Sequence, residues 1–207
     1  TQQEILEKIN DLAELLISMQ SKGYSGACWG YNFDWQARRL FLFPKNIPTV
    51  VATTFCATAL FEAYEITKNQ IYLDTALSSA KFILNDLNRH QIGANGFILS
   101  YSPLKGNDTV INASLLGAKT LIQCYKYTGN RDYLDTAKVI VDTCCNLQSD
   151  DGSWVYGLLP TQSWIDSYHT GYNLDAISYY KNISGDNTYN EHLSKGYNYY
   201  INNFFES

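Results

Sequence analysis

The segment YKYTGNRDYLDTA at residues 125–137 recurs in similar form in the chain. The stretch YEITKNQIYLDTA at residues 64–76 is a close copy, 61 residues earlier (125 − 64), and a degenerate third copy runs from Tyr180 to Leu193. Self-similarity of this kind indicates one supersecondary unit that is stacked several times. Each copy joins two helical patterns through a tight turn, so the repeating unit is predicted to be an antiparallel helical hairpin.

Apolar spacing predicts seven helices, which form one leading helix and three complete pairs. Two of them are apolar over most of their surface and are expected to be buried on most sides, whereas their successors carry a single apolar stripe. This alternation predicts inner helices surrounded by outer helices. The predicted ranges are 4–20, 49–66, 71–88, 110–127, 132–147, 167–182 and 188–204.

The connections between these helices differ in length. The turns from inner to outer helices are short, whereas the segments 21–48, 89–108 and 148–166 are long and contain Gly and Pro. In antiparallel hairpins the two kinds of connection lie at opposite ends, so the long segments are predicted to share one rim, at the N-termini of the inner helices. Long ordered loops on a rigid scaffold commonly carry function.

Composition narrows the possible partners. The 207 residues have a net charge of −5, which argues against a nucleic acid or an anionic membrane as partner. No apolar run is long enough for a transmembrane helix. The five cysteines have no metal-finger spacing, and no nucleotide-binding loop or Ser-His-Asp signature is visible, so no metal and no cofactor are predicted. The odd cysteine count and the lack of a visible signal peptide favour a cytoplasmic location.

The outer helices lead into segments of one style, of which Gln148-Ser149-Asp150-Asp151-Gly152-Ser153-Trp154 is the clearest. With the hairpin repeat, this segment resembles the α/α-toroid superfamily, which includes six-hairpin glycosidases, toroidal polysaccharide lyases, sugar epimerases and terpenoid cyclases. The resemblance implies an all-α fold of antiparallel hairpins in a partial α/α-toroid, a single domain over residues 1–207, and a carbohydrate as substrate or ligand. A closed toroid usually has six hairpins, so we expect a longer chain, or a partner chain that completes the ring.

The densest polar and aromatic cluster lies at the start of the predicted helix over 167–182. Asp166 and His169 are three residues apart, and His169 and Asn173 are four apart, so the three side chains can share one helix face. Either this cluster forms a catalytic or sugar-binding wall, or Asp166 merely caps the helix while His169 packs against a neighbour. The other candidates for substrate contact in the cluster are Trp164, Tyr168 and Tyr172.

Glycoside hydrolysis requires two carboxyl groups, one protonated and one ionised. Asp34 lies between Phe33 and Trp35, whose apolar side chains could raise its pKa and make it an acid. We therefore predict Asp34 and Asp166 as the acid/base pair, with His169 in support. Asp151 and Asp108 are interpreted as a turn residue and a helix cap, respectively.

All four Trp residues fall on the predicted rim, which favours platforms on which sugar rings stack, with loop anchoring as the alternative. These residues are Trp29, Trp35, Trp154 and Trp164.

Hydrolysis is the first hypothesis for the activity. Toroidal lyases draw on Asn, His, Tyr and Arg, so lyase or epimerase chemistry on a uronate is an alternative. The residues that would then act on the uronate are Asn112 or Asn173, His169, a tyrosine, and Arg38 or Arg39. A noncatalytic toroid that binds a glycan or a protein is the third possibility.

Overall fold

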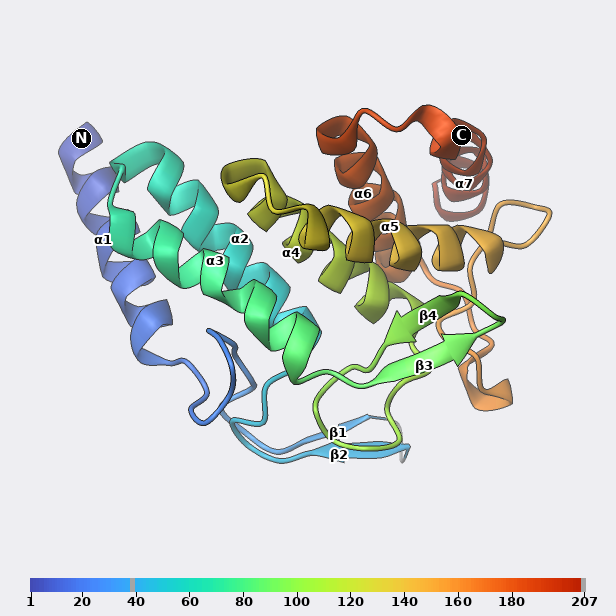
Figure 1. Cartoon of the computed structure of the whole chain (residues 1–207), viewed down its shortest axis with the longest axis horizontal. Helices are drawn as coiled ribbons and strands as arrows, with labels where there is room; N and C mark the ends of the chain where they lie inside the picture. Colours follow the sequence, from blue (N-terminus) through green and yellow to red (C-terminus); the bar gives the residue numbers. More distant parts are fainter. Residues whose placement is uncertain (38–39, 206–207) are drawn as a thin grey trace. The chain divides into compact units, whose positions relative to one another are not determined.

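The structure is a computed structural model that describes residues 1–37 and 40–205, and seven α-helices dominate this part of the chain (Figure 1). The seven predicted helices are all present, and each predicted end lies within three residues of the observed end. Their bounds are α1 Gln2–Ser18, α2 Val50–Thr67, α3 Gln70–Asn85, α4 Ile111–Thr128, α5 Arg131–Asn146, α6 Ser167–Ser184 and α7 Asn190–Phe204.

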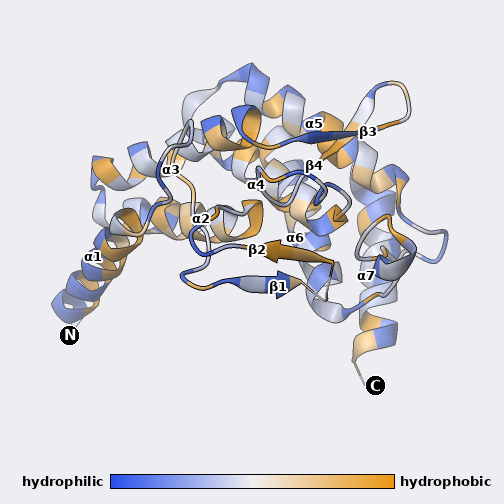
Figure 2. Ribbon diagram, turned by 90° about the horizontal axis from the view of Figure 1, so that it is seen from below, coloured by the Kyte–Doolittle hydropathy of each residue, from blue (hydrophilic) through white to orange (hydrophobic). Residues whose placement is uncertain are grey.

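Two antiparallel β-hairpins lie inside the long connections, where no strands were predicted. Strand β1 (Trp35–Ala37) pairs with β2 (Phe41–Phe43), and β3 (Arg89–Ile92) pairs with β4 (Gly96–Leu99). Figure 2 shows β2 as a strongly apolar strand beside the paler β1. The third long connection contains the short 3₁₀ helix η1, Pro160–Gln162, and a second one, η2, spans Asn187–Tyr189.

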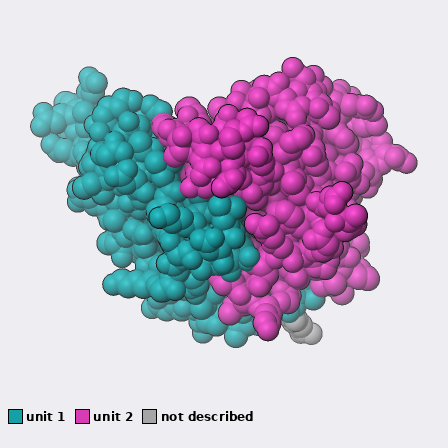
Figure 3. Space-filling view, in the orientation of Figure 1, with its two compact units in different colours: residues 1–87 teal, residues 88–207 magenta. Residues whose placement is uncertain are grey.

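The contacts divide the chain into two compact units, residues 1–87 and 88–207, which are coloured separately in Figure 3. The first unit contains α1, α2, α3 and the β1–β2 hairpin. The second contains α4 to α7 with the β3–β4 hairpin. The single domain expected from the sequence stays a prediction.

The repeated sequence segment forms the same turn three times. In each copy a hydroxyl of the first turn residue accepts the backbone N–H of the third residue at 3.2 Å, and the side chain of that third residue caps the next helix. The middle residue has a left-handed backbone conformation. The turns are Thr67-Lys68-Asn69, Thr128-Gly129-Asn130 and Ser184-Gly185-Asp186. The internal repeat therefore encodes a helix stop followed directly by a helix start.

Helix α4 is the core element of the second unit. Thirteen of its 18 residues are buried, and it packs against both α5 and α6. Helix α5 buries one stripe that includes Leu134, Ala137 and Ile140. The predicted difference between an inner helix and its outer partner is therefore confirmed for this hairpin.

Helix α1 contacts α2 and is largely exposed. Ala13 is its buried residue, while Ile5, Leu12 and the C-cap residue Met19 are exposed. Among residues 1–37 and 40–205, no helix has both the length and the hydropathy that crossing a membrane requires.

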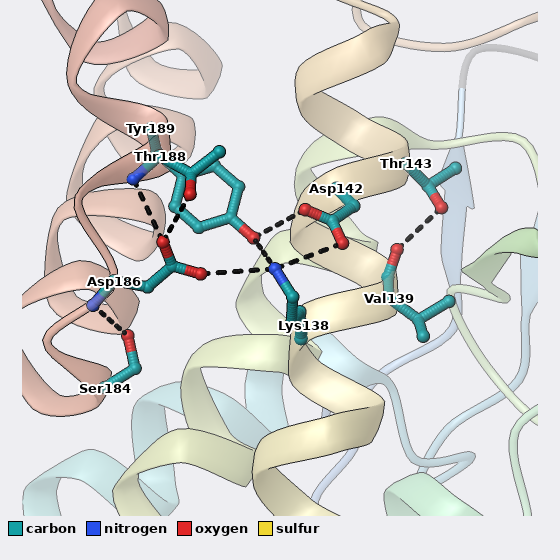
Figure 4. Close-up of polar contacts among 8 residues, drawn as sticks. All are labelled: Lys138, Val139, Asp142, Thr143, Ser184, Asp186, Thr188 and Tyr189. Atoms are coloured by element: carbon teal, nitrogen blue, oxygen red, sulfur yellow. Dashed lines mark hydrogen bonds and ion pairs between the residues drawn. The ribbon is translucent and has the colours of Figure 1, made fainter.

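A polar cluster joins α5 to the turn between α6 and α7 (Figure 4). The ammonium group of Lys138 donates to Asp186 at 3.2 Å and to the hydroxyl of Tyr189 at 3.1 Å, and Tyr189 donates to Asp142 at 2.6 Å. Hydrogen bonds from Thr188, with the bond and charge of Lys138, lower the pKa of Asp186 to about 2. Burial, and then the bond to Asp142, raise the pKa of Tyr189, so its phenol stays protonated and acts as the donor.

Candidate active site

The first turn of α6 forms the centre of the candidate site. Asp166 is the N-cap residue, and its Oδ1 accepts the backbone N–H of His169 at 2.9 Å. The backbone carbonyl of Asp166 accepts the hydroxyl of Thr170 at 2.7 Å. These bonds fix the carboxylate relative to the helix, because the cap geometry determines where its second oxygen points.

That second oxygen binds the imidazole. Oδ2 of Asp166 lies 2.6 Å from Nδ1 of His169, and the indole N–H of Trp164 donates to the same oxygen at 3.2 Å. Both side chains of the pair are about one-third exposed. A carboxylate bound to Nδ1 sets the orientation of the ring and leaves Nε2 available for other partners.

The environment of Asp166 keeps its carboxyl group ionised. Burial alone raises the pKa of Asp166, but the hydrogen bonds and charge of His169 and the bond from Trp164 outweigh this effect, and the net shift is downward. An ionised Asp166 is a good partner for an imidazolium ion and a poor proton donor.

Aromatic rings form a wall beside the pair. Tyr156 stacks on Trp164 with ring centroids 4.3 Å apart and planes inclined by 16°, and its ring meets that of His169 edge-on at 4.6 Å. The backbone holds this wall, because Tyr156 N–H donates to Trp164 O and Ile111 N–H donates to Tyr156 O. Tyr156 was not among the predicted site residues, since nothing in its local sequence distinguishes it from an ordinary loop tyrosine.

Helices α4 and α6 both begin beside this site. Ile111, the first residue of α4, donates its N–H to Tyr156 O, and Tyr156 N–H donates to Trp164 O, just before α6. Farther along the two helices, Lys119 donates to Asp175 at 2.6 Å. The expectation that long connections lead to neighbouring inner-helix N-termini therefore holds within the second unit. Asn112 on α4 and Asn173 on α6 are 3% and 2% exposed.

The two asparagines have unusual surroundings. Their Oδ1 atoms are buried acceptors without a hydrogen-bond partner among the residues that the structure describes. A buried unpaired acceptor costs about 1–3 kcal/mol, so a donor from water or a ligand would be favourable here.

The two tyrosines predicted for substrate contact differ in exposure. Tyr172 is half-buried, whereas Tyr168 is exposed.

A second His–Asp contact lies in the same unit. Nδ1 of His90, on β3, is 3.4 Å from Oδ2 of Asp108, and both side chains are about one-third exposed. The sequence interpretation of Asp108 as a helix cap is wrong, because Val110 is the N-cap residue of α4 and makes no side-chain cap bond.

Two of the four tryptophans anchor loops. Trp29 and Trp154 are 3% and 2% exposed, and their indole N–H groups donate to the backbone carbonyls of Leu16 and Cys144. Their rings are covered by the protein, so the loop-anchoring alternative describes both residues. The interpretation of Asp151 as a turn residue is confirmed, since its carboxylate accepts the N–H and the hydroxyl of Ser153.

The remaining predicted residues lie in the first unit. Asp34 is exposed, and its Oδ1 accepts the backbone N–H of Lys45 at 2.7 Å. Trp35 is half-buried and stacks on Phe43. Arg38, like Arg39, lies outside the described residues. Asp34 and Asp166 belong to different units, so their action as an acid/base pair stays a prediction.

Among residues 1–37 and 40–205, no group of three or more His, Cys, Asp or Glu side chains is arranged to hold a metal ion.

The antiparallel helical hairpins define an all-α protein with the α/α-toroid fold, and comparison with known structures shows the same fold. The cellobiose 2-epimerase of Spirochaeta thermophila is 13% identical over 96% of this chain and 54% of its own, with a TM-score of 0.70. The unsaturated glucuronyl hydrolase of Bacillus sp. GL1 is 17% identical over 94% of this chain and 53% of its own, with a TM-score of 0.63.

An α-mannanase of glycoside hydrolase family 76 from Bacteroides thetaiotaomicron is also similar. It is 17% identical over 85% of this chain and 53% of its own, with a TM-score of 0.61. At these identities the likeness concerns the fold, and this chain spans about half the length of the first structures it matches. No protein-family model and no curated protein sequence matches the chain.

Proposed function

We propose that this chain belongs to a carbohydrate-active enzyme in which His169, oriented by Asp166, transfers a proton to or from a sugar. The 2.6 Å contact between Asp166 and His169 carries this proposal. The wall formed by Tyr156 and Trp164 supports it, because aromatic rings beside a polar pair suit a ligand with apolar faces and hydroxyl edges. The similar structures named above include an epimerase, a hydrolase and a mannanase, all of which act on carbohydrates.

The pairing of Asp166 with His169 determines which reaction we propose first. Elimination or epimerisation on a uronate or another sugar requires a base that removes a proton from carbon, and histidine commonly serves as such a base. An Asp166 that stays ionised stabilises the imidazolium formed in that step. The pair therefore favours lyase or epimerase chemistry.

Hydrolysis is the second candidate, and the ionised Asp166 also supports it. In that reaction Asp166 would be the ionised carboxylate, and Asp34 would have to supply the proton.

The test is an activity screen with three probes, namely cello-oligosaccharides, α-mannan and a glycosaminoglycan. An ultraviolet-absorbing product indicates elimination, new reducing ends without such absorbance indicate hydrolysis, and a changed proton NMR spectrum at constant chain length indicates epimerisation. The variant His169→Asn should lose at least about a hundredfold in turnover.

His192→Asn is the matched control. This residue is a histidine of the same unit that binds Gln148 at 2.7 Å, outside the candidate site. Equal turnover in wild-type protein and His169→Asn would refute the proposal. Saturable glycan binding without any turnover would assign the chain to the noncatalytic class.

A further inference from the structure

The segment 31–43 of the first unit brings five aromatic rings together. Across the β1–β2 pair, Trp35 lies opposite Phe43 and Ala37 lies opposite Phe41, so the rings of Trp35, Phe41 and Phe43 share one face of the hairpin. Tyr31 and Phe33 precede β1 and join this group because Tyr31 contacts both Trp35 and Phe33.

The rings contact one another in a continuous row, which we term the aromatic row (Tyr31, Phe33, Trp35, Phe41 and Phe43). Phe33 stacks on Tyr31 at 5.7 Å, Tyr31 meets Trp35 at 5.4 Å, Trp35 stacks on Phe43 at 5.2 Å, and Phe43 contacts Phe41 at 4.8 Å. Phe33, at one end of the row, is 55% exposed, whereas Tyr31, Trp35 and Phe41 are half-buried and Phe43 is 4% exposed.

The backbone below the row is held firmly. Asn46 N–H donates to Tyr31 O at 2.7 Å, Thr49 N–H donates to Trp29 O at 2.9 Å, and the side chain of Asp34 accepts the N–H of Lys45. A Cβ on Gly30 would lie 2.1 Å from Ile47 O, so this close pairing requires glycine. A platform fixed in this way loses little conformational freedom when it binds a ligand.

Firmly held but solvent-accessible aromatic rings are a feature of binding surfaces. The accessible rings present flat apolar faces, and such faces suit a sugar, which combines an apolar face with hydroxyl edges.

We propose that the aromatic row binds consecutive sugar units of an oligo- or polysaccharide chain by stacking. This inference rests on the proposed carbohydrate function and deepens it, because a row of rings favours a polymeric substrate over a monosaccharide or disaccharide. It assigns binding roles to Tyr31, Phe33 and Phe41, next to that predicted for Trp35.

The experiment measures the affinity of the full chain for cello-oligosaccharides of two to six units, and for manno-oligosaccharides of the same lengths, by calorimetry. In the wild-type protein, affinity for at least one series should increase with chain length. Phe33→Ala and Tyr31→Ala should each weaken hexasaccharide binding about two- to tenfold and flatten the dependence on length, while disaccharide binding changes little.

Phe205→Ala is the matched control, because Phe205 is also 55% exposed and lies in the second unit. The inference is overturned if Phe33→Ala and Tyr31→Ala bind the hexasaccharide as tightly as the control, if affinity does not depend on length, or if neither series binds. The two proposals can fail separately. Loss of turnover in His169→Asn, together with unchanged hexasaccharide binding in Phe33→Ala and Tyr31→Ala, would support the proposed function and overturn the role of the aromatic row. Binding of vesicles or of a protein in place of glycans would also overturn it.

Discussion

At the scale of single residues, Asp166 combines a structural and a chemical role. One of its oxygens caps α6 and the other binds His169, so substitutions can separate the two functions. Asparagine caps helices about as well as aspartate, whereas alanine does not. The two variants therefore test different parts of the same side chain.

We predict that Asp166→Asn lowers turnover about 10²- to 10⁴-fold while the free energy of unfolding changes by less than about 1 kcal/mol. The amide keeps the cap bond but carries no charge to stabilise an imidazolium ion. Asp166→Ala should lose activity to a similar extent and cost about 1 kcal/mol more in stability. Urea unfolding and initial rates measure the two effects, and full activity in Asp166→Asn would contradict the role of the pair.

Trp154 and Trp164 allow a second comparison at this scale. Trp154→Phe removes a buried indole N–H that donates to Cys144 O, and should destabilise the protein by about 1–2 kcal/mol. Trp164→Phe removes the longer hydrogen bond from the indole N–H to Asp166, in a half-exposed site. Its effect on the free energy of unfolding should therefore be smaller. Equal losses in thermal unfolding would show that the two indoles have the same structural role.

At the scale of elements, the helices were predictable and the β-hairpins were not. Long periodic segments with repeated stop and start residues, such as Thr128-Gly129-Asn130, determine helices locally. Strand β3 has the sequence Arg-His-Gln-Ile, which shows no clear alternation of apolar and polar residues. The strand forms only because it pairs with β4. Likewise, Asp166 and His169 were found by helical spacing, whereas Tyr156 reaches them through backbone hydrogen bonds to Trp164 of its own loop and to Ile111 at the start of α4.

Glycines with positive φ provide a prediction about turns. Gly129 and Gly152 both have left-handed backbones, but space for a side chain is open at Gly129, and a Cβ on Gly152 would lie 2.3 Å from Lys195 O. Gly129→Ala should therefore cost about 1 kcal/mol, and Gly152→Ala distinctly more, because the loop must also move away from α7. Urea unfolding of both variants measures the difference, and equal costs would contradict the clash.

The cluster that joins α5 to the α6–α7 turn predicts a dependence of stability on pH. The ordinary pKa of an Asp side chain is 3.8, and that of Asp186 in the folded protein is about 2. The pKa is lowered because Thr188 and then Lys138 bind the ionised form. Its contribution is therefore fully present above pH 3.8 and is lost as the pH falls towards 2. Since the side chain is partly exposed, we expect about 1 kcal/mol.

Asp186→Asn is the test of this contribution. The variant should be less stable than the wild-type protein at pH 6, and the difference should shrink as the pH approaches 2. A difference in the free energy of unfolding that stays constant between pH 6 and pH 2 would contradict the assignment.

At the scale of the whole molecule, the core of the second unit is self-sufficient. Helix α4 is covered by α5 and α6, the β3–β4 hairpin packs on α4 and α5, and Asp166, His169 and Tyr156 all lie within residues 88–207. A domain of this length can bury a core of its own. The hairpin repeat supports this view, because stacked units interact mainly with their neighbours.

We therefore predict that residues 88–207, expressed alone, form a helical protein that unfolds cooperatively in urea. The fragment should retain the Asp166–His169 pair, visible as a His169 ring resonance in NMR that Asp166→Asn shifts. It should lack the aromatic row and with it the increase of glycan affinity with chain length. A fragment with a broad, non-cooperative transition would show that the core around α4 depends on the first unit, and the candidate active site would then require both units for its structure.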